Sequence, residues 1–198
     1  MNKFKKFNSL KELIKKPIFR ASEAREVGVS SSLLCYYVQQ GLIERVDRGV
    51  YRGIEPVLDV DFRWEDIILV TKSISGGVVC LISALALYEL TDEIPRVHWI
   101  AVDNTKSAPK RKGTKIFRTR NIELGRTEIQ VGSETITIFD KERTIIDTFR
   151  YMGKETAIKA LKNSLTTSSE EKIDLKKLQN YAKKLRVNIT PYILAVTI

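Results

Sequence analysis

The side chains that could catalyse a reaction or bind a metal ion are few. Asp140, Glu142 and Asp147 are the closest set of carboxylates, and together they could form a cluster for a divalent cation. Asp140 and Glu142, however, stand at the start of a predicted helix, where acidic side chains cap free N–H groups and interact favourably with the helix dipole. Asp147 follows Arg143 by four residues, a spacing at which the two pair on a helix. We interpret all three carboxylates as structural.

The cysteines, the histidine and the sequence motifs also give no sign of a catalytic or metal-binding site. Cys35 and Cys80 are far apart and belong to no disulfide or metal-binding pattern, and the chain has a single histidine, His98. The sequence contains no glycine-rich phosphate loop, no GxSxG motif and no HExxH motif. We predict a protein that is not an enzyme, with no catalytic residue, no metal ion and no cofactor.

The distribution of charge points to nucleic acid. The 198 residues include 34 Lys and Arg against 24 Asp and Glu, a net charge of +10. Residues 1–52 have a net charge of +6, residues 53–103 of −6, and residues 104–122 hold seven cations and no carboxylate. Solubilising lysines would be scattered evenly, whereas segregated charge favours an electrostatic binding surface.

Composition and hydropathy favour a soluble, folded protein. The chain is 43% hydrophobic and 29% charged, which is the balance of a globular protein. Its longest apolar runs, at residues 67–70 and 78–82, are too short to cross a membrane. The basic N-terminus lacks the apolar core of a signal peptide. We expect a cytoplasmic protein.

The first fifty residues have the order of elements of a winged helix-turn-helix. Apolar spacing and capping residues predict three short helices, followed by a hairpin with strands at residues 42–46 and 50–52 around Gly49. The expected helix limits are Ser9 and Pro17, Ser22 and Gly28, and Ser30 and Gly41.

The rest of the chain is predicted to be α+β. Gly53 and Pro56 indicate a linker, so we divide the chain into a DNA-binding domain at residues 1–55 and an α+β domain at residues 60–198. Helices are expected at 61–74, 83–90, 140–151, 154–165 and 174–185, and strands at 97–102, 115–118, 128–131 and 135–139. The run at 78–81 fits either a strand or the start of a helix.

The helix at 31–40 would be the recognition helix, whose exposed side chains meet base edges in the major groove. With Leu34, Tyr37 and Val38 in the core, serine and glutamine remain on the opposite face, and both can hydrogen-bond to bases. The helix has no Lys or Arg, so phosphate contacts would come from the wing and the first helix. The predicted contacts are Lys11, Lys15, Ser31, Ser32, Tyr36, Gln39, Arg45 and Arg48, with Lys16, Leu33, Gln40 and Arg52 as neighbours.

The basic stretch at residues 104–120 is the second candidate surface. Pro109 and Gly113 indicate a loop, and Phe117 lies among the cations, where it could pack or stack on a base. An ordinary solvated loop explains the stretch equally well. The candidate contacts are Lys110, Arg111, Lys112, Lys115 and Arg118.

Several motifs along the chain together resemble the AbiEi antitoxin family of type IV toxin–antitoxin systems. They are the RGVY wing at 48–51, SALAL at 83–87, LTD at 90–92 with Pro95, FRTRNI at 117–122 and DKERTIID at 140–147. Tyr88-Glu89 departs from the His-Gly expected after the SALA helix, and the hydrophobic residues 193–198 are also atypical.

The resemblance implies a transcriptional repressor that binds inverted repeats of double-stranded DNA in its own promoter. It also implies neutralisation of a nucleotidyltransferase-like toxin, without a stable complex, in abortive infection and phage defence. In this sequence Ser31, Ser32, Tyr36 and Arg48 match the DNA contacts.

Two other functions remain open at this point. One is a transcription factor unrelated to a toxin, whose second domain senses a ligand or partner. The other is a DNA-cleaving enzyme with a winged-helix targeting domain, which would need an Asp…Glu-x-Lys pattern on its strands. The predicted strands do not supply that pattern.

Overall fold

The computed structural model describes residues 6–54, 61–166 and 172–197. It divides into two compact units. The first comprises residues 1–75 and 130–135, and the second comprises residues 76–129 and 136–198. The linker was predicted at residues 53–56. Gly53 is instead the buried last residue of the third strand, and residues 55 and 56 lie outside the described residues.

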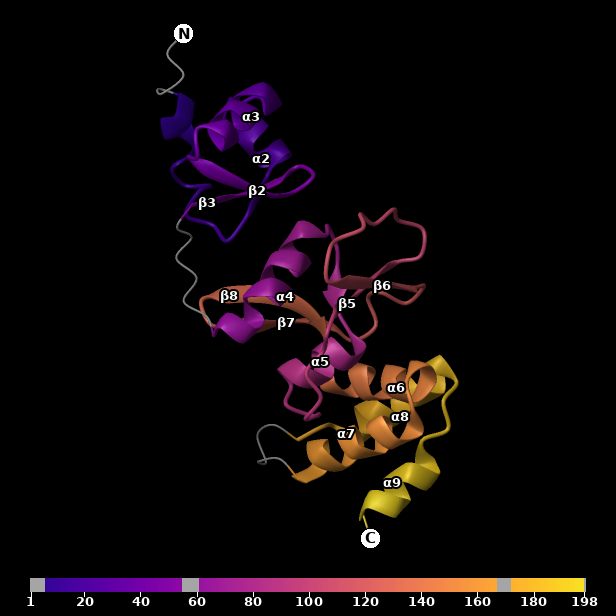
Figure 1. The fold of residues 1–198 in the computed structure, drawn as a ribbon. Helices are drawn as coiled ribbons and strands as arrows, with labels where there is room; N and C mark the ends of the chain where they lie inside the picture. The colour runs from indigo at the N-terminus through magenta and orange to yellow at the C-terminus, as the bar shows by residue number, and fades with distance from the viewer. Residues whose placement is uncertain (1–5, 55–60, 167–171, 198) are drawn as a thin grey trace. The chain divides into compact units, whose positions relative to one another are not determined.

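The first unit contains a winged helix (Figure 1). A three-stranded antiparallel sheet in the order β1-β3-β2 supports two helices and a short 3₁₀ helix. The core contains Leu10, Phe19, Leu34 and Tyr37, all at most 1% exposed. The elements are η1 (Asn8–Leu10), β1 (Phe19–Arg20), α2 (Ala21–Glu26), α3 (Ser31–Gln39), β2 (Ile43–Asp47) and β3 (Val50–Gly53).

Local signals placed most of these elements correctly. The Ser30 hydroxyl accepts a hydrogen bond from the backbone N–H of Leu33 at the start of α3, and Gly28 and Gly41 follow α2 and α3 with positive φ. Gly49 has φ +72° in the turn between β2 and β3, a conformation that glycine adopts without strain. The predicted hairpin and the helix predicted at residues 31–40 are therefore confirmed.

Two predictions in this unit were wrong in detail. The first helix does not start at Ser9: Lys6 and Phe7 are already α-helical, the 3₁₀ helix η1 follows them, and turns lead from η1 to Pro17. The second helix begins after Arg20 instead of Ser22, because the backbone N–H of Arg20 donates to Glu23 Oε2 at 2.8 Å. A carboxylate three residues into the helix thus fixes its start.

The second unit contains most of a mixed five-stranded sheet in the order β6-β5-β4-β8-β7. β5 runs parallel to β6 and antiparallel to β4, which runs parallel to β8. The strands are β4 (Val78–Val79), β5 (His98–Asp103), β6 (Thr114–Thr119), β7 (Arg126–Val131) and β8 (Glu134–Phe139). The ambiguous run at 78–81 is therefore a short strand that leads into a helix.

The helices of the α+β part follow the predicted order with shifted ends. α4 (Phe62–Ser73) belongs to the first unit, and α5 (Leu81–Leu87), α6 (Lys141–Tyr151), α7 (Lys154–Thr166) and α8 (Leu175–Leu185) to the second. α9 (Thr190–Thr197) was not predicted. α6 packs against α5, α7 and α8 (Figure 1). Leu85, Ile145, Ile146, Leu161 and Leu178 are fully buried in their common core. No helix in the described residues has the length and apolar character needed to span a membrane.

Candidate nucleic-acid interface

The exposed face of α3 is narrow, polar and uncharged. Ser31, Ser32, Cys35 and Gln39 are all exposed. Successive residues of an α-helix are rotated by about 100°, so these four fall within one stripe along the helix, with Cys35 near its centre. Hydroxyl and amide groups in such a stripe can donate and accept hydrogen bonds at base edges.

The structure corrects the position of two residues predicted for this face. Leu33 and Tyr36 are half-buried and pack against the winged-helix core, where the Tyr36 ring meets the Tyr37 ring at 5.8 Å. They therefore border the exposed stripe. Cys35, which the sequence reasoning did not select, lies within it. The helical spacing of Ser31, Cys35 and Gln39 was the signal that could have identified it.

The arginines of the wing differ in exposure and in ion pairing. Arg45 and Arg48 are exposed, and Arg45 Nε donates to the carbonyl of Asp47 at the β2–β3 turn. Arg52 is half-buried, and its guanidinium forms an ion pair with Glu44 at 2.7 Å. Arg45 and Arg48 are thus the wing cations best placed to contact phosphate.

The lysines before β1 also differ from one another. Lys11 is exposed. Lys15 pairs with Glu12 at 2.8 Å, with both side chains largely in solvent, whereas Lys16 pairs with Glu23 at 2.9 Å. An exposed pair of the Lys15–Glu12 kind is weak and exchanges easily for another anion, so Lys15 remains available to phosphate.

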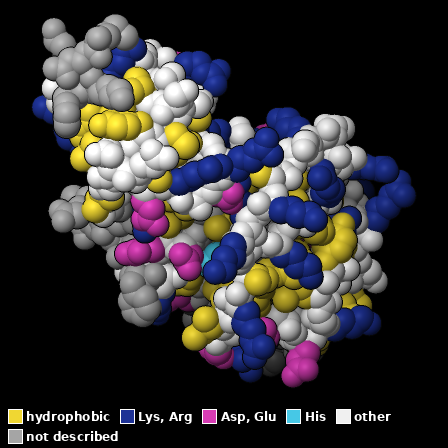
Figure 2. Space-filling model, turned by 45° about the horizontal axis from the view of Figure 1, so that its top comes forward, with side chains coloured by type: hydrophobic (Ala, Val, Ile, Leu, Met, Phe, Trp, Pro, Cys, Tyr) yellow, Lys and Arg dark blue, Asp and Glu magenta, His cyan; other side chains and the backbone are white. Residues whose placement is uncertain are grey.

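The predicted second surface is not one flat patch. Lys110 and Lys112 are exposed in the loop before β6, and Arg111 is half-buried there. Lys115 and Arg118 are three residues apart on β6, so their side chains project from opposite faces of the sheet. Figure 2 shows Lys and Arg side chains interspersed with hydrophobic ones over much of the visible surface.

Three side chains of β6 make contacts with neighbouring residues. Lys115 Nζ lies 4.0 Å from the centre of the Trp99 ring, and the two residues are register partners. The Phe117 ring packs edge-on against Tyr151 at 4.7 Å, and Arg118 Nη1 donates to the carbonyl of Lys106 at 2.7 Å. Phe117 therefore has a packing role, one of its two predicted alternatives.

The carboxylates considered for a metal site are occupied by cations and N–H groups. Asp147 is fully buried between Arg143, whose Nε donates at 2.7 Å, and Arg150, whose Nη1 donates at 2.9 Å. Asp140 accepts the backbone N–H of Arg143 at 2.7 Å, which caps α6 as predicted. Glu142 accepts the backbone N–H of Asp174 at 2.8 Å. Across the described residues, no group of three or more His, Cys, Asp or Glu could hold a metal ion.

Lys177 links α8 to the start of α6. Its ammonium lies 3.0 Å from Asp140 and 3.1 Å from Glu142, and the Tyr181 hydroxyl donates to Asp140 at 3.1 Å. Burial disfavours the charge on Lys177, but the two carboxylates outweigh burial and raise its pKa. Burial and the same carboxylates raise the pKa of Tyr88. This cluster is a clamp between α6 and α8.

Comparison with known families identifies the first module. Residues 8–52 match the family described as "Transcriptional regulator, AbiEi antitoxin". The N-terminal module is similar to the winged helix of the AbiEi regulators. The match runs from η1 through β3, so it includes the α3 stripe and both exposed wing arginines, and it confirms the resemblance over these residues. The class of function indicated for the chain is therefore that of a transcriptional regulator or antitoxin. A search of curated proteins finds no match.

Proposed function

We propose that the chain is a DNA-binding antitoxin that represses its own operon and neutralises a nucleotidyltransferase-like toxin of a type IV system. In this proposal residues 1–55 bind inverted repeats in the promoter and residues 60–198 form the antitoxin domain. The observation that supports it most directly is the exposed polar stripe on α3, which lies inside the segment that matches the AbiEi family.

The α3 stripe would read bases while the surrounding cations hold the backbone. Ser31, Ser32 and Gln39 offer hydrogen bonds without a charge, so they supply selectivity more than affinity. Arg48 and Lys11 are exposed cations of the same module that can neutralise phosphates. Arg45 and Lys15 would assist them, and Tyr36 would support α3 from its half-buried flank.

The cations of the second unit would add phosphate contacts that do not depend on sequence. Lys110 and Lys112 are exposed in one loop, so they can follow a bent or flexible backbone. Lys115 and Arg118 point to opposite faces of β6 and cannot both meet one flat surface. We expect Lys110, Arg111 and Lys112 to act together, with either Lys115 or Arg118 beside them.

The two cysteines provide a test of where DNA binds. Cys35 is exposed in the middle of the α3 stripe, and Cys80 is fully buried, where burial raises the pKa of its thiol. N-ethylmaleimide should therefore modify Cys35 and spare Cys80. With duplex DNA from upstream of the gene at about tenfold above its Kd, the modification rate of Cys35 should fall about tenfold, because about 90% of the protein is bound.

Mass spectrometry of the modified peptides measures both rates, and a gel shift confirms the bound fraction. Cys80 serves as the unreactive internal reference. A scrambled duplex of equal length should give less protection at the same concentration. Unchanged modification of Cys35 in a sample that is bound by gel shift would place the DNA away from α3 and contradict the assignment.

The antitoxin part of the proposal is supported by the family match, and it needs a separate test. A neighbouring nucleotidyltransferase-like gene, expressed from an unrelated promoter, should stop growth alone and permit it together with this chain. A variant with Ser31→Ala, Ser32→Ala and Gln39→Ala should lose operator binding and still restore growth, because those residues lie outside the antitoxin domain. Growth arrest that the wild-type chain does not relieve would contradict the antitoxin role.

A further inference from the structure

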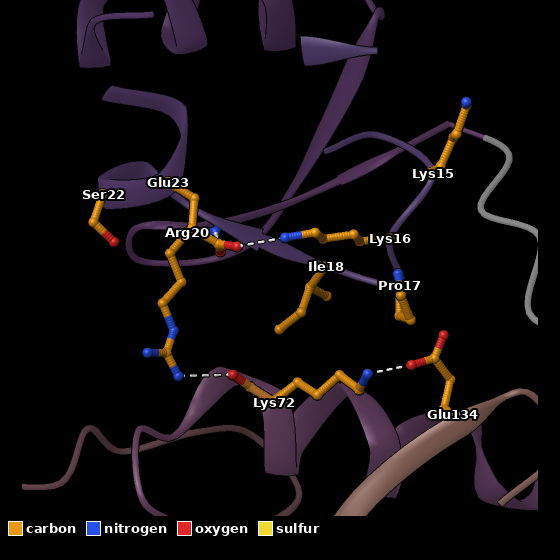
Figure 3. A pocket seen from close by; sticks show the side chains of 9 residues that line it. All are labelled: Lys15, Lys16, Pro17, Ile18, Arg20, Ser22, Glu23, Lys72 and Glu134. Carbon is orange, nitrogen blue, oxygen red and sulfur yellow. Dashed lines mark hydrogen bonds and ion pairs between the residues drawn. The ribbon is translucent and has the colours of Figure 1, made fainter. Parts of the chain in front are cut away.

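A cavity of about 650 Å³ lies within the first unit, and no residue of α3 is among its lining residues (Figure 3). Its lining comes from the segment before β1, the start of α2, the last turn of α4 and residue 134. All of these residues belong to the same compact unit. The lining residues are Lys15, Lys16, Pro17, Ile18, Arg20, Ser22, Glu23, Lys72 and Glu134.

The lining contains four cations and only two carboxylates, and each carboxylate already holds a lysine. Lys16 pairs with Glu23 at 2.9 Å, and Lys72 pairs with Glu134. Burial opposes ionisation of Glu23, but Lys16 and the backbone N–H of Arg20 lower its pKa, so the carboxylate remains charged and does not accept a proton from a ligand. Lys15 pairs with Glu12, which is outside the lining, at 2.8 Å, so the excess positive charge of the lining is that of Arg20.

Arg20 supplies a second kind of donor. Its Nη2 donates to the main-chain carbonyl of Lys72 at 2.9 Å, which directs the guanidinium toward the cavity (Figure 3). A carbonyl neutralises no charge, and a guanidinium has further N–H groups in a planar fork that matches the oxygens of a phosphate. Arg20, Lys16 and Lys72 thus surround a space that favours an anion.

The remaining wall is apolar. Pro17 and Ile18 are buried residues whose side chains line the cavity between the charged groups. A volume of about 650 Å³ lies within the range of pockets that hold small molecules. We infer that this cavity binds a phosphorylated small molecule of nucleotide size, with its phosphates at Arg20, Lys16 and Lys72 and its apolar part against Pro17 and Ile18.

Such a ligand would contact residues that build the winged helix. Arg20 ends β1, pairs with Val50 of β3, and precedes α2 directly. A ligand that changes the position of Arg20 would therefore act on the frame that holds α3. This inference does not depend on the toxin or on the operator sequence.

Titration calorimetry on the full chain without DNA tests the inference, with ATP, inorganic pyrophosphate and adenosine as probes. ATP and pyrophosphate should bind, and adenosine should bind at least about tenfold more weakly because it lacks the charged groups. Arg20→Gln and Lys72→Gln should each weaken ATP binding about tenfold or more, since each removes a charge-assisted contact.

Lys159→Gln is the matched control, because Lys159 is an exposed lysine of the second unit that pairs with Asp92. It should bind ATP like the wild type, and thermal melts should show all three variants folded. Failure of ATP and pyrophosphate to bind, or equal binding by wild type, Arg20→Gln and Lys72→Gln, would overturn the inference. Pyrophosphate binding without ATP binding would contradict the inference that the ligand is of nucleotide size. A gel shift with the promoter DNA remains a separate result in every case.

Discussion

Replacing Asp147 by alanine is expected to lower the free energy of unfolding by about 3–5 kcal/mol. Asp147 and Arg143 are both fully buried, and the substitution would leave the Arg143 guanidinium with no opposite charge. Removing one partner of a buried ion pair costs far more than the pair itself contributes, because the remaining charge has lost its water and cannot recover it.

Arg143 cannot move to escape that cost. Its Nη1 donates to the carbonyls of Asn121 and Leu124 at 3.0 Å each, and its guanidinium lies 4.6 Å from the centre of the Phe139 ring. These contacts hold the cation in place whether or not Asp147 is present. Asp147→Asn, which retains an oxygen acceptor, is expected to lose less stability than Asp147→Ala.

Urea unfolding measured by circular dichroism tests this prediction. Asp92→Ala is the matched control, because Asp92 forms an exposed ion pair with Lys159 at 2.6 Å, and pairs of this kind contribute at most about 1 kcal/mol. Similar small losses for Asp147→Ala and Asp92→Ala would show that Asp147 is not structural. That result would reopen a chemical role for this carboxylate.

Gly125→Ala is the second substitution with a large expected effect, a loss of about 2–5 kcal/mol in unfolding free energy. Gly125 has φ +73°, which disfavours any side chain. A Cβ added there would lie 2.6 Å from Cβ of Arg143 and 3.0 Å from Oδ1 of Asp140. The carbonyl of Gly125 also accepts the N–H of Asp140 at 2.7 Å, so the turn cannot withdraw from α6 without losing this bond.

Gly113→Ala measures the cost of a positive φ for alanine without the steric clash that Gly125→Ala also causes. Gly113 has a similar φ of +66°, but an added Cβ would meet no atom within 4 Å. We expect it to lose only about 1–2 kcal/mol. The same unfolding experiment compares the two alanine variants. Equal losses at positions 113 and 125 would contradict the close approach of Gly125 to Arg143.

Features fixed by neighbouring residues could be predicted from the sequence. Ser30, Gly41 and Gly49 set the ends of α3 and the turn of the wing through local hydrogen bonds and positive φ, so these elements were placed to within a residue or two. The Arg143–Asp147 pair was also predictable, because a spacing of four residues on a helix places the side chains together.

Features that depend on distant partners could not be predicted. β1 has only two residues, and it is a strand because Phe19 and Arg20 pair with β3 some thirty residues later. The parallel pairing of β5 with β6 and the short strand β4 likewise depend on tertiary contacts. Helical spacing gave no reason to expect a 3₁₀ helix at residues 8–10, where turns carry the chain into β1.

Some residues of the candidate DNA-binding face could likewise be predicted from the sequence, and others could not. Ser31, Ser32 and Gln39 could be selected because their side chains are polar and the core side of α3 was clear from Leu34 and Tyr37. Cys35 was omitted because its type suggests burial, although its angle on the helix places it between the selected residues. The cavity at Arg20 was also beyond prediction, since it joins residues more than fifty positions apart in the sequence.

Arg143 holds the loop before β7 by main-chain carbonyls, and this has a consequence for how the protein can diverge. Every amino acid at position 121 offers the same carbonyl, and the Asn121 side chain is exposed. A change of residue 121 therefore leaves the hydrogen bond from Arg143 intact, whereas Arg143, Asp147 and Gly125 depend on one another and should change only together.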